Sequence, residues 1–541
     1  MELNNPQDIN PKKARKSSKK EALQKPATNK SLTLTGFERE NALFHALDSK
    51  QIGYLTREQI LTGLEQAGLR LDDPRLKEIQ ERLDGCVPPN EIKLEAFATC
   101  IAPCIGLVEQ AIQGRLIIPD FSGFCEKIKT IYDKTATSTG GKVADYIPQL
   151  GRVDPEQYAV SLCTIDGQRF SLGESNTKFC VQSTCKPINY CLALNENPTE
   201  IVHEHVGREP SGRGFNELAL NHNGRPHNPM INAGAIMSCS LIKPELNVAD
   251  RFDYVMERWG ALAGGNKPSF SNSVYLSERQ TADRNFALGY FMRENEAFPK
   301  GTELIDILEF YFQCCSIELT ADMMSVIAAT LANGGVCPVT GERVFGPETV
   351  QNCLSLMYSC GMYDFSGEFA FTIGLPAKSG VSGAMMIVVP NVMGLCTWSP
   401  RLDRLGNSVR GIEFCKELVG TFNFHNYDNL TGVSDKIDPR LQPTTSEGET
   451  ITAMIWAASK GDLTGVQQLI ARGASLDKPD YDGRAPLHLA AAEGRAEVVE
   501  LFIHHGANLG PVDRWGQTPL EDAKRGGHKG IVSMLERAMN N

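Results

Sequence analysis

The fold of this chain is decided by the segment Phe179-Cys180-Val181-Gln182-Ser183-Thr184-Cys185-Lys186-Pro187-Ile188-Asn189-Tyr190, where an apolar run meets a small hydroxyl residue. If a helix begins near Ser183, then Ser183 and Lys186 are neighbours on one helix face, about 5–6 Å apart at Cβ. Proline is tolerated in the first turn of a helix, so Pro187 fits a helix start here. A lysine amine so placed can take the proton of the serine hydroxyl, which is a weak nucleophile without a base.

The spacing Ser-x-x-Lys is the nucleophile motif of penicillin-recognising enzymes, but it is not specific by itself. It occurs five times in this chain, beginning at Ser17, Ser175, Ser183, Ser240 and Ser475. Only the copy at Ser183 lies where a strand-like apolar run turns into a helix-like one. The alternative is that the Ser183 hydroxyl merely caps a helix. The segment alone leaves both interpretations open.

The composition describes a folded, acidic protein. Its 541 residues suggest three or four domains. The share of apolar residues is 41% and that of charged residues 22%, which is typical of globular and not of disordered chains. The net charge of −11 argues against nucleic acid as a general partner.

The polar N-terminal residues and the longest uncharged run both indicate where in the cell the protein is expected. Residues 1–33 are polar and rich in lysine, which predicts a disordered basic tail that is either a solvated arm or a docking signal. The opening residues show neither a secretory signal nor a transit peptide pattern, so we expect a cytoplasmic protein. A mitochondrial location is the alternative if a presequence is missing or cryptic. The longest uncharged run, Ser379–Pro400, has turn residues in its middle, which favours two strands joined by a turn over a membrane span.

The sixteen cysteines include no Cys-x-x-Cys pair, so we expect no zinc site. Several lie within apolar runs, such as Cys185, Cys191 and the adjacent Cys314-Cys315. This placement is typical of buried free thiols in a reducing compartment.

The first folded segment, residues 34–135, has the apolar spacing of helices. Within it, Asp48–Gln59 has the length of an EF-hand loop. However, Lys50, Ile52 and Gln59 replace the oxygen ligands expected at the third, fifth and twelfth positions. The segment therefore predicts an all-α, EF-hand-like scaffold without bound metal.

A hairpin is expected just before the opening segment. The runs Tyr158–Ile165 and Gln168–Leu172 are strand-like and flank Asp166-Gly167, the residue pair of a tight type I′ turn.

Beyond the opening segment, helical runs and a later strand complete a recognisable order. Helices are expected at Phe252–Trp259, Leu304–Cys314 and Met323–Leu331, and Lys378-Ser379-Gly380 is expected to open the strand that continues through Ala384–Val389. This order matches the serine β-lactamase architecture, in which a strand with Lys-Thr-Gly lines the active site.

The C-terminal part repeats with a period of 33 residues. Gly461, Gly494 and Gly527 are 33 apart, and so are Pro486 and Pro519. This is the ankyrin period, and we count two full repeats and one partial repeat. His488 falls in the turn of the repeat pattern, so it is interpreted as a structural residue and not as a metal ligand.

Taken together, the chain resembles the animal kidney- and liver-type glutaminases from about residue 36 onward. The densest blocks of similarity are Gly140–Leu150, Pro226–Ile236, Ser277-Glu278-Arg279, Asp283–Ala287 and Cys360–Gly367. The resemblance implies an α/β (α+β) serine β-lactamase-like catalytic domain at 136–430, after the EF-hand-like domain. A linker at 431–449 and a C-terminal ankyrin-repeat α-solenoid at 450–541 follow.

The family resemblance also implies an activity and a site. The family hydrolyses L-glutamine to L-glutamate and ammonia with no metal or organic cofactor, and inorganic phosphate is its activator. By resemblance Ser183 is the nucleophile, Lys186 its base and Tyr363 a proton relay to the leaving ammonia. The substrate-binding positions of the family fall on Tyr146, Ser183, Asn232, Glu278, Asn285, Tyr311, Tyr363 and Val381. In that arrangement Glu278 pairs with the substrate ammonium, and the N–H groups of Ser183 and Val381 form an oxyanion hole.

Partners follow from the same resemblance. L-Glutamine is the expected substrate, and homodimers, homotetramers or filaments are the expected assemblies, with no nucleic acid and no membrane. The kidney-type pattern has phenylalanine where this chain has Ala219, which leaves tetramer formation and phosphate activation open. The ankyrin repeats either bind a protein partner or only stack on neighbouring protein. Two rival interpretations are a β-lactam-recognising enzyme and a catalytically silent scaffold.

Overall fold

The computed structural model describes residues 36–48, 52–86, 88, 90–212, 214–428, 435–441, 447–471 and 474–540. The predicted basic tail at 1–33 and most of the predicted linker at 431–449 lie outside the described residues. The boundaries expected for the domains stay predictions.

The N-terminal domain is all-α, as predicted. Its helices are α1 (Gly36–Leu47), α2 (Arg57–Gln66), η1 (Pro74–Leu76), α3 (Lys77–Asp84), α4 (Leu94–Ile101), η2 (Ala102–Cys104) and α5 (Ile105–Ile112). A short antiparallel bridge between Leu55 and Ile92 joins the two interhelical loops. The carboxylate of Asp48 accepts hydrogen bonds from the backbone N–H groups of Ile52 (3.0 Å) and Gly53 (2.8 Å). This carboxylate therefore stabilises the loop conformation itself; that the loop binds no metal stays a prediction.

One described segment, Leu94–Ile112, is long and apolar enough to cross a membrane by length and composition. In this fold it is divided into α4, η2 and α5. Its side chains Phe97, Ile101 and Val108 are buried in the core of the N-terminal domain. Packing within the domain thus accounts for part of the apolar character of the segment.

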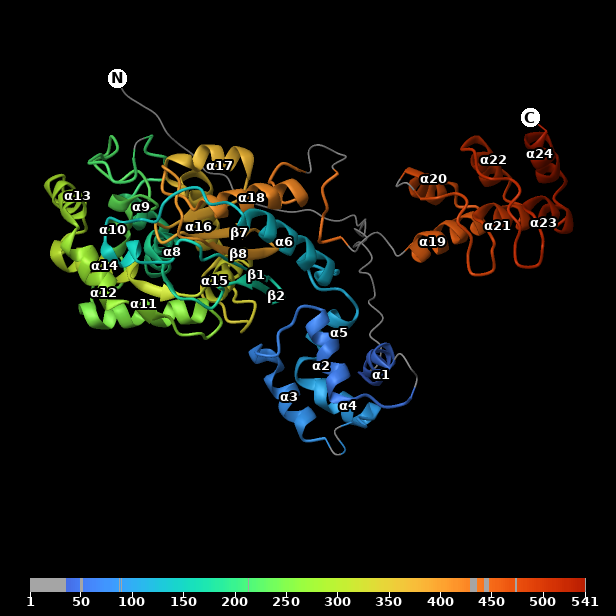
Figure 1. Cartoon of the computed structure of the whole chain (residues 1–541), viewed down its shortest axis with the longest axis horizontal. Helices are drawn as coiled ribbons and strands as arrows, with labels where there is room; N and C mark the ends of the chain where they lie inside the picture. Colours follow the sequence, from blue (N-terminus) through green and yellow to red (C-terminus); the bar gives the residue numbers. More distant parts are fainter. Residues whose placement is uncertain are drawn as a thin grey trace, which may run out of the picture.

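The catalytic domain is built on a five-stranded antiparallel sheet with the order β2-β1-β8-β7-β6. The strands are β1 (Ala159–Thr164), β2 (Arg169–Gly173), β6 (Ala377–Ser379), β7 (Ala384–Val389) and β8 (Met393–Trp398). Along β7, Met385 and Ile387 pack with α6 (Phe121–Ala136) and α18 (Val409–Thr421), whereas Met386 and Val388 face the opposite core. Both faces of the sheet are therefore covered by helices, with α15 (Ala321–Ala332) against β8, β1 and β7 (Figure 1).

The face of the sheet that carries α15 supports a largely helical subdomain. Its elements are α7 (Pro148–Gly151), η3 (Gln182–Thr184), α8 (Cys185–Glu196), α9 (Thr199–His205), α10 (Asn232–Ser240), α11 (Val248–Leu262), α12 (Asn272–Gln280), α13 (Asp283–Glu294), α14 (Leu304–Cys315) and α16 (Pro347–Cys360). Apolar side chains of η4 (Tyr363–Phe365) and α17 (Ser366–Thr372) instead pack in the core on the α6 and α18 side. A small second sheet has the order β3-β5-β4, with β3 (Phe179–Cys180), β4 (Ser269–Phe270) and β5 (Ile317–Leu319). The three predicted helical runs lie in α11, α14 and α15, so the mixed α/β expectation is confirmed.

The hairpin of β1 and β2 is present, but its predicted turn type is wrong. Gly167 has a φ of 88°, whereas Asp166 is absent from the described residues with positive φ. The N–H of Thr164 donates to the carbonyl of Gln168 (2.9 Å), which leaves a three-residue loop that ends on glycine in the left-handed region. Such loops are the next most common after the two-residue type I′ connection.

The N-terminal domain docks on this hairpin. Arg75 Nη1 donates to the Asp166 carbonyl (2.9 Å), and the Gln168 side chain donates to the Ala67 carbonyl (2.8 Å). The backbone N–H of Arg169, at the start of β2, donates to the Gly68 carbonyl (2.9 Å). Backbone groups of the N-terminal domain thus occupy the outer edge of β2.

The Lys-Ser-Gly motif also lies differently from the prediction. Lys378 and Ser379 end the short edge strand β6, and Gly380–Gly383 turn the chain into β7. The motif therefore closes a strand and does not open the longer one. The two strands predicted within the uncharged run, β7 and β8, are confirmed.

The C-terminal helices form three pairs: α19 (Glu447–Lys460) with α20 (Leu463–Ala471), α21 (Pro486–Ala492) with α22 (Ala496–His504), and α23 (Pro519–Arg525) with α24 (Lys529–Met539). The structure thus has three helix pairs, where the sequence predicted two full repeats and one partial repeat. The structural interpretation of His488 is supported: its Nδ1 accepts from the Ala485 N–H (3.1 Å), so its Nε2 donates to the Gln517 carbonyl (3.1 Å).

The buried thiols predict how stability changes with pH. All sixteen cysteines are free, and burial raises the pKa of Cys125 and of Cys415 to about 12. In the unfolded chain a thiol titrates near about 8.5. Between that value and about 12 the unfolded chain therefore holds fewer protons than the folded chain, and the free energy of unfolding falls as pH rises. Burial also raises the pKa of further thiols. These thiols outnumber the two buried lysines, Lys186 and Lys378, whose lowered pKa values change the stability in the opposite direction.

Urea unfolding in reducing buffer should thus show a steady loss of stability from pH 8 to about 10. The variant Cys415→Ala should show a shallower decline than the wild type, because one raised thiol is gone. A stability that stays constant or rises over this range would contradict the assignment.

Candidate active site

Ser183 lies at a sharp turn between a strand and a helix. Strand β3 pairs with β5, and the Val181 N–H donates to the Ile317 carbonyl (2.8 Å), which fixes the chain just before η3. The next residue, Gln182, has a φ of 48°, in the left-handed region that few residues other than glycine adopt. Such strain costs on the order of 1–3 kcal/mol and persists where the surrounding structure enforces it. The turn leaves Ser183 half-buried in η3, two residues before α8 begins.

Ser183 and Lys186 meet as the sequence predicted. The Lys186 Nζ atom lies 2.6 Å from Ser183 Oγ, and the Lys186 side chain is 1% exposed. Burial lowers the pKa of Lys186, which favours the neutral amine. A charged ammonium has only donors, so only the neutral amine can accept the serine proton. The pair therefore has the geometry and the electrostatics of a nucleophile with its base.

Tyr363 approaches the same serine from η4. Burial raises the pKa of Tyr363, and the nearby Ser183 hydroxyl opposes part of that rise. Its φ of 54° is again left-handed. Two residues earlier, a Cβ on Gly361 would lie 1.8 Å from the Ala377 carbonyl oxygen, so only glycine allows this approach to β6. The close approach brings Tyr363 against the strand that leads to Val381.

The backbone around Val381 is arranged to bind an oxyanion. A Cβ on Gly380 would lie 3.0 Å from the Val181 carbonyl, which places the end of β6 directly beside η3. Among the described residues, neither the Ser183 N–H nor the Val381 N–H donates a backbone hydrogen bond. These two donors are therefore available to a developing negative charge near Ser183.

A buried carboxylate lies on another side of the site. Glu278 of α12 is 8% exposed, and burial raises its pKa, while a hydrogen bond from Tyr146 and the nearby Gln182 side chain oppose the rise. The Tyr146 hydroxyl donates to the Glu278 carboxylate, although almost half of the Tyr146 surface is exposed. Lys186 is also near enough to lower the pKa of Glu278. A buried carboxylate with neutral hydrogen-bond donors can bind a ligand cation.

Three further polar side chains complete the site. The Asn232 side chain, at the start of α10, donates to Asn285 Oδ1 (3.1 Å) on α13 and accepts from the Tyr311 hydroxyl (3.5 Å) on α14. The Tyr311 ring centroid lies 5.7 Å from Lys186 Nζ. This chain of contacts joins the two asparagines to the Ser183–Lys186 pair.

All nine predicted site residues are therefore brought together, although they come from separate elements of the catalytic domain. Their roles in binding and catalysis stay predictions. The sequence prediction did not include Gln182 and Lys378 among the site residues. Both belong to motifs quoted from the sequence, but the signals that identify them, a left-handed φ and complete burial, are visible only in the fold.

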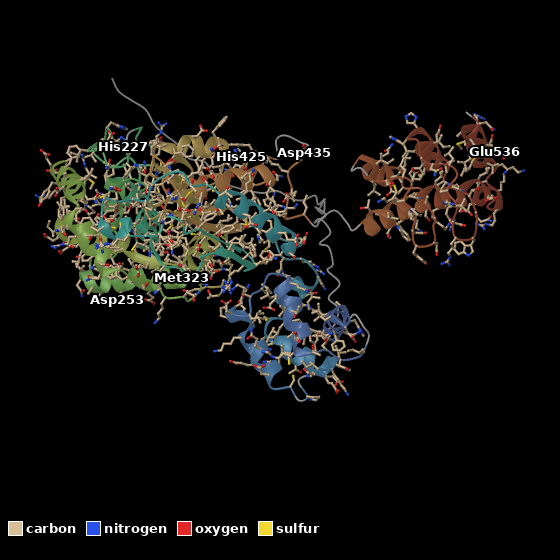
Figure 2. The ribbon with its side chains drawn as sticks, viewed as in Figure 1. His227, Asp253, Met323, His425, Asp435 and Glu536 are labelled. Atoms are coloured by element: carbon tan, nitrogen blue, oxygen red, sulfur yellow. The ribbon has the colours of Figure 1, made fainter. Side chains whose placement is uncertain are left out.

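The described residues contain no group of three or more His, Cys, Asp or Glu side chains that could hold a metal ion. His227, Asp253, Met323 and His425 are spread over the catalytic domain in Figure 2 and do not converge on one point. That the chain works without a cofactor stays a prediction.

Comparisons with known proteins give three family models. The model described as glutaminase matches residues 141–427, that of ankyrin repeats in three copies matches 436–540, and that of an EF-hand domain matches 39–119. The mitochondrial liver isoform of glutaminase from Mus musculus is 47% identical over 434 residues, which cover 80% of this chain and 72% of the relative. A glutaminase from Nostoc sp. is 40% identical over 321 residues, 59% of this chain and 95% of the relative. The crystal structure of Mglu in its native form is 30% identical, with a TM-score of 0.54, and the match covers 68% of this chain and 88% of that one.

Proposed function

Since this chain belongs to the glutaminase family, we propose that it hydrolyses L-glutamine to L-glutamate and ammonia through a serine ester. The observation that carries the proposal is the buried Lys186 amine, 2.6 Å from Ser183 Oγ, at the edge of a site that also holds the buried carboxylate of Glu278. The first pair supplies a nucleophile and its base, and the carboxylate supplies a partner for an amino acid's ammonium group.

The first half-reaction forms the ester. Neutral Lys186 takes the Ser183 proton as Oγ attacks the side-chain amide carbon of glutamine. The carbonyl oxygen becomes an oxyanion, which the N–H groups of Ser183 and Val381 bind. The amide C–N bond then breaks, and the proton that Lys186 took from Ser183 passes through Tyr363 to the leaving nitrogen, which returns Lys186 to its neutral form. Ammonia departs, and a γ-glutamyl ester remains on Ser183.

The second half-reaction releases the product. Water attacks the ester carbon and gives up a proton to Lys186, so that a second oxyanion forms in the same two-donor site. The C–O bond to Ser183 breaks, and Oγ recovers a proton. Glutamate leaves, and the enzyme returns to its starting protonation state.

The polar side chains account for the choice of a free amino acid. Glu278 binds the α-ammonium, while Asn232, Asn285, Tyr311 and Tyr146 offer donors and acceptors to the polar ends of the ligand. A β-lactam substrate has no free α-ammonium in this position. The arrangement therefore favours glutamine over the substrates of other enzymes with the same fold.

The proposal is tested by ammonia release. Purified protein should release ammonia from L-glutamine much faster than from L-asparagine, whose amide lies one methylene closer to the α-carbon, and should not hydrolyse nitrocefin. The Ser183→Ala protein, purified in parallel, controls for contaminating amidohydrolases. Nitrocefin hydrolysis would instead assign a β-lactam-recognising enzyme. No ammonia release even at high phosphate would assign a silent scaffold.

Assembly and activation by phosphate belong to the same proposal. We propose that the chain forms homo-oligomers and that phosphate activates it. Leu218, Leu276 and Tyr290 are large side chains exposed on the catalytic domain, which supports assembly. The neighbouring Phe215 packs against the Tyr363 ring with centroids 4.8 Å apart, so the loop that contains Ala219 touches the active site. Measurement of particle mass with and without phosphate distinguishes dimer, tetramer and filament.

The C-terminal ankyrin repeats expose several large aromatic side chains. We propose that the repeats bind a protein partner, for which the exposed Trp456, Tyr481 and Trp515 are suitable contact residues.

A relative of this chain carries a mitochondrial designation in its name, which supports the mitochondrial alternative over the cytoplasmic expectation. Fractionation of cells that express the full chain decides between the compartments.

A further inference from the structure

Lys378 is a buried lysine that the proposed mechanism does not use. Its side chain is fully buried, at 0% exposure, in the edge strand β6. Its amine donates to the carbonyl of the next residue, Ser379, at 2.6 Å, and no carboxylate among the described residues influences its protonation. A buried amine without a counter-ion destabilises a fold, so packing alone does not explain this residue. Such groups are concentrated at functional sites.

The second contact of the amine is the ring of Tyr363. The Lys378 Nζ atom lies 4.4 Å from the centre of that ring, where an amine N–H can contact the aromatic face. Tyr363 is itself held in a left-handed backbone conformation, which persists only where neighbours enforce it. The Ser379 N–H donates to the Gly361 carbonyl (3.3 Å), which ties the same two segments through the backbone.

The surroundings of Lys378 favour the neutral form of its amine, so its contact with the Tyr363 ring involves no charge. Burial lowers the pKa of Lys378 well below its ordinary value, and the nearby Lys186 amine lowers it further. The titratable groups around Lys378 and Lys186 are Cys185 on α8, Cys239 on α10, Glu278 on α12, Tyr311 and Cys315 on α14, and Tyr363 on η4. A neutral Lys378 still donates a hydrogen bond to Ser379, and it adds no positive charge next to the base.

We propose that Lys378 is a positioning residue, which holds the Tyr363 ring so that the Tyr363 hydroxyl faces Ser183. It acts through Tyr363 and does not touch the substrate. The inference rests on the proposed function, because the readout is glutamine hydrolysis.

A double-mutant cycle with Tyr363→Phe tests this role. Phenylalanine keeps the ring but removes the hydroxyl that Lys378 is proposed to place. In the wild-type background, Lys378→Met should lower kcat at least about tenfold and change KM less than about threefold. In the Tyr363→Phe background, the same Lys378→Met change should lower kcat less than about twofold, because no hydroxyl remains to be positioned. The matched control is Lys300→Met, on an exposed lysine, which should leave both constants unchanged.

Two results would overturn the proposal. One is an equal fold-loss from Lys378→Met in both backgrounds, which is the signature of an independent structural role. The other is a kcat for Lys378→Met that equals that of the wild type. If Lys378→Met does not fold, as judged by circular dichroism, the cycle is run with Lys378→Gln under the same criteria, since glutamine is an uncharged side chain. A wild-type protein that releases no ammonia contradicts the proposed function, whereas an active wild type with either result above contradicts only the role of Lys378.

Discussion

Replacing Ser183 with alanine is expected to lower kcat for glutamine hydrolysis by roughly 10⁴- to 10⁶-fold, the range seen when a serine nucleophile is removed. The reason is that Ser183 Oγ, which lies 2.6 Å from the Lys186 amine, is the proposed attacking atom, and alanine has no hydroxyl to replace it. Folding should be preserved, because Ser183 is half-buried and alanine removes only its hydroxyl.

Two measurements complete this test. Binding of glutamine to Ser183→Ala, followed by calorimetry, should be retained, because Glu278, Asn232 and Asn285 still hold the amino acid. The chain supplies a matched control in Ser175, a buried serine with the same Ser-x-x-Lys spacing in the same domain. Ser175→Ala should leave kcat within about twofold of the wild type, as expected for a substitution away from the chemistry. Near-normal turnover by Ser183→Ala would exclude the ester mechanism.

Replacing Lys186 with methionine should separate activity from stability. Methionine has nearly the same length but no amine, so kcat should fall by about 10²- to 10⁴-fold, the usual contribution of a general base. The thermal midpoint should stay the same or rise, because a 1%-exposed amine is replaced by an apolar group. A large fall in the midpoint, together with the loss of activity, would show that Lys186 holds the fold instead.

The pH dependence of the wild type belongs to the same test. The base must be neutral, and burial lowers the pKa of Lys186. Activity should therefore rise with pH through that lowered pKa and reach its plateau below the ordinary range of lysine. The residual activity of Lys186→Met should lack this rise, since the group that titrates is gone. A wild-type profile that falls over this range would contradict the assignment.

Local patterns predicted the elements well, because they depend on neighbours in sequence. The helix start at Ser183, the hairpin and the pair β7–β8 follow from turn residues and alternation over a few positions. The turn type at Asp166-Gly167 was wrong for a tertiary reason. A Cβ on Gly167 would lie 2.2 Å from the Arg75 side chain, so the turn is shaped partly by a residue of the preceding domain, 92 positions earlier in the chain.

The site was less accessible to local patterns. Ser183 and Lys186 are three residues apart and could be paired from helix geometry. Glu278 and Tyr363 lie far from them in the sequence, and only the resemblance to a known family placed them in the same site. Lys378 is a site residue that the sequence did not identify, because a lysine in a common tripeptide looks like an ordinary strand residue. Its burial depends on elements from the whole domain.

The docking of the N-terminal domain on β2 has a consequence for aggregation. An edge strand presents unpaired N–H and C=O groups and can recruit a strand from another molecule. Here the Gly68 carbonyl occupies the Arg169 N–H, and the Gln168 side chain is tied to Ala67 and Ile118 carbonyls. A shortened protein without the helical domain would expose this edge to strand exchange between molecules. The EF-hand-like domain thus protects the edge of the sheet from pairing with other molecules.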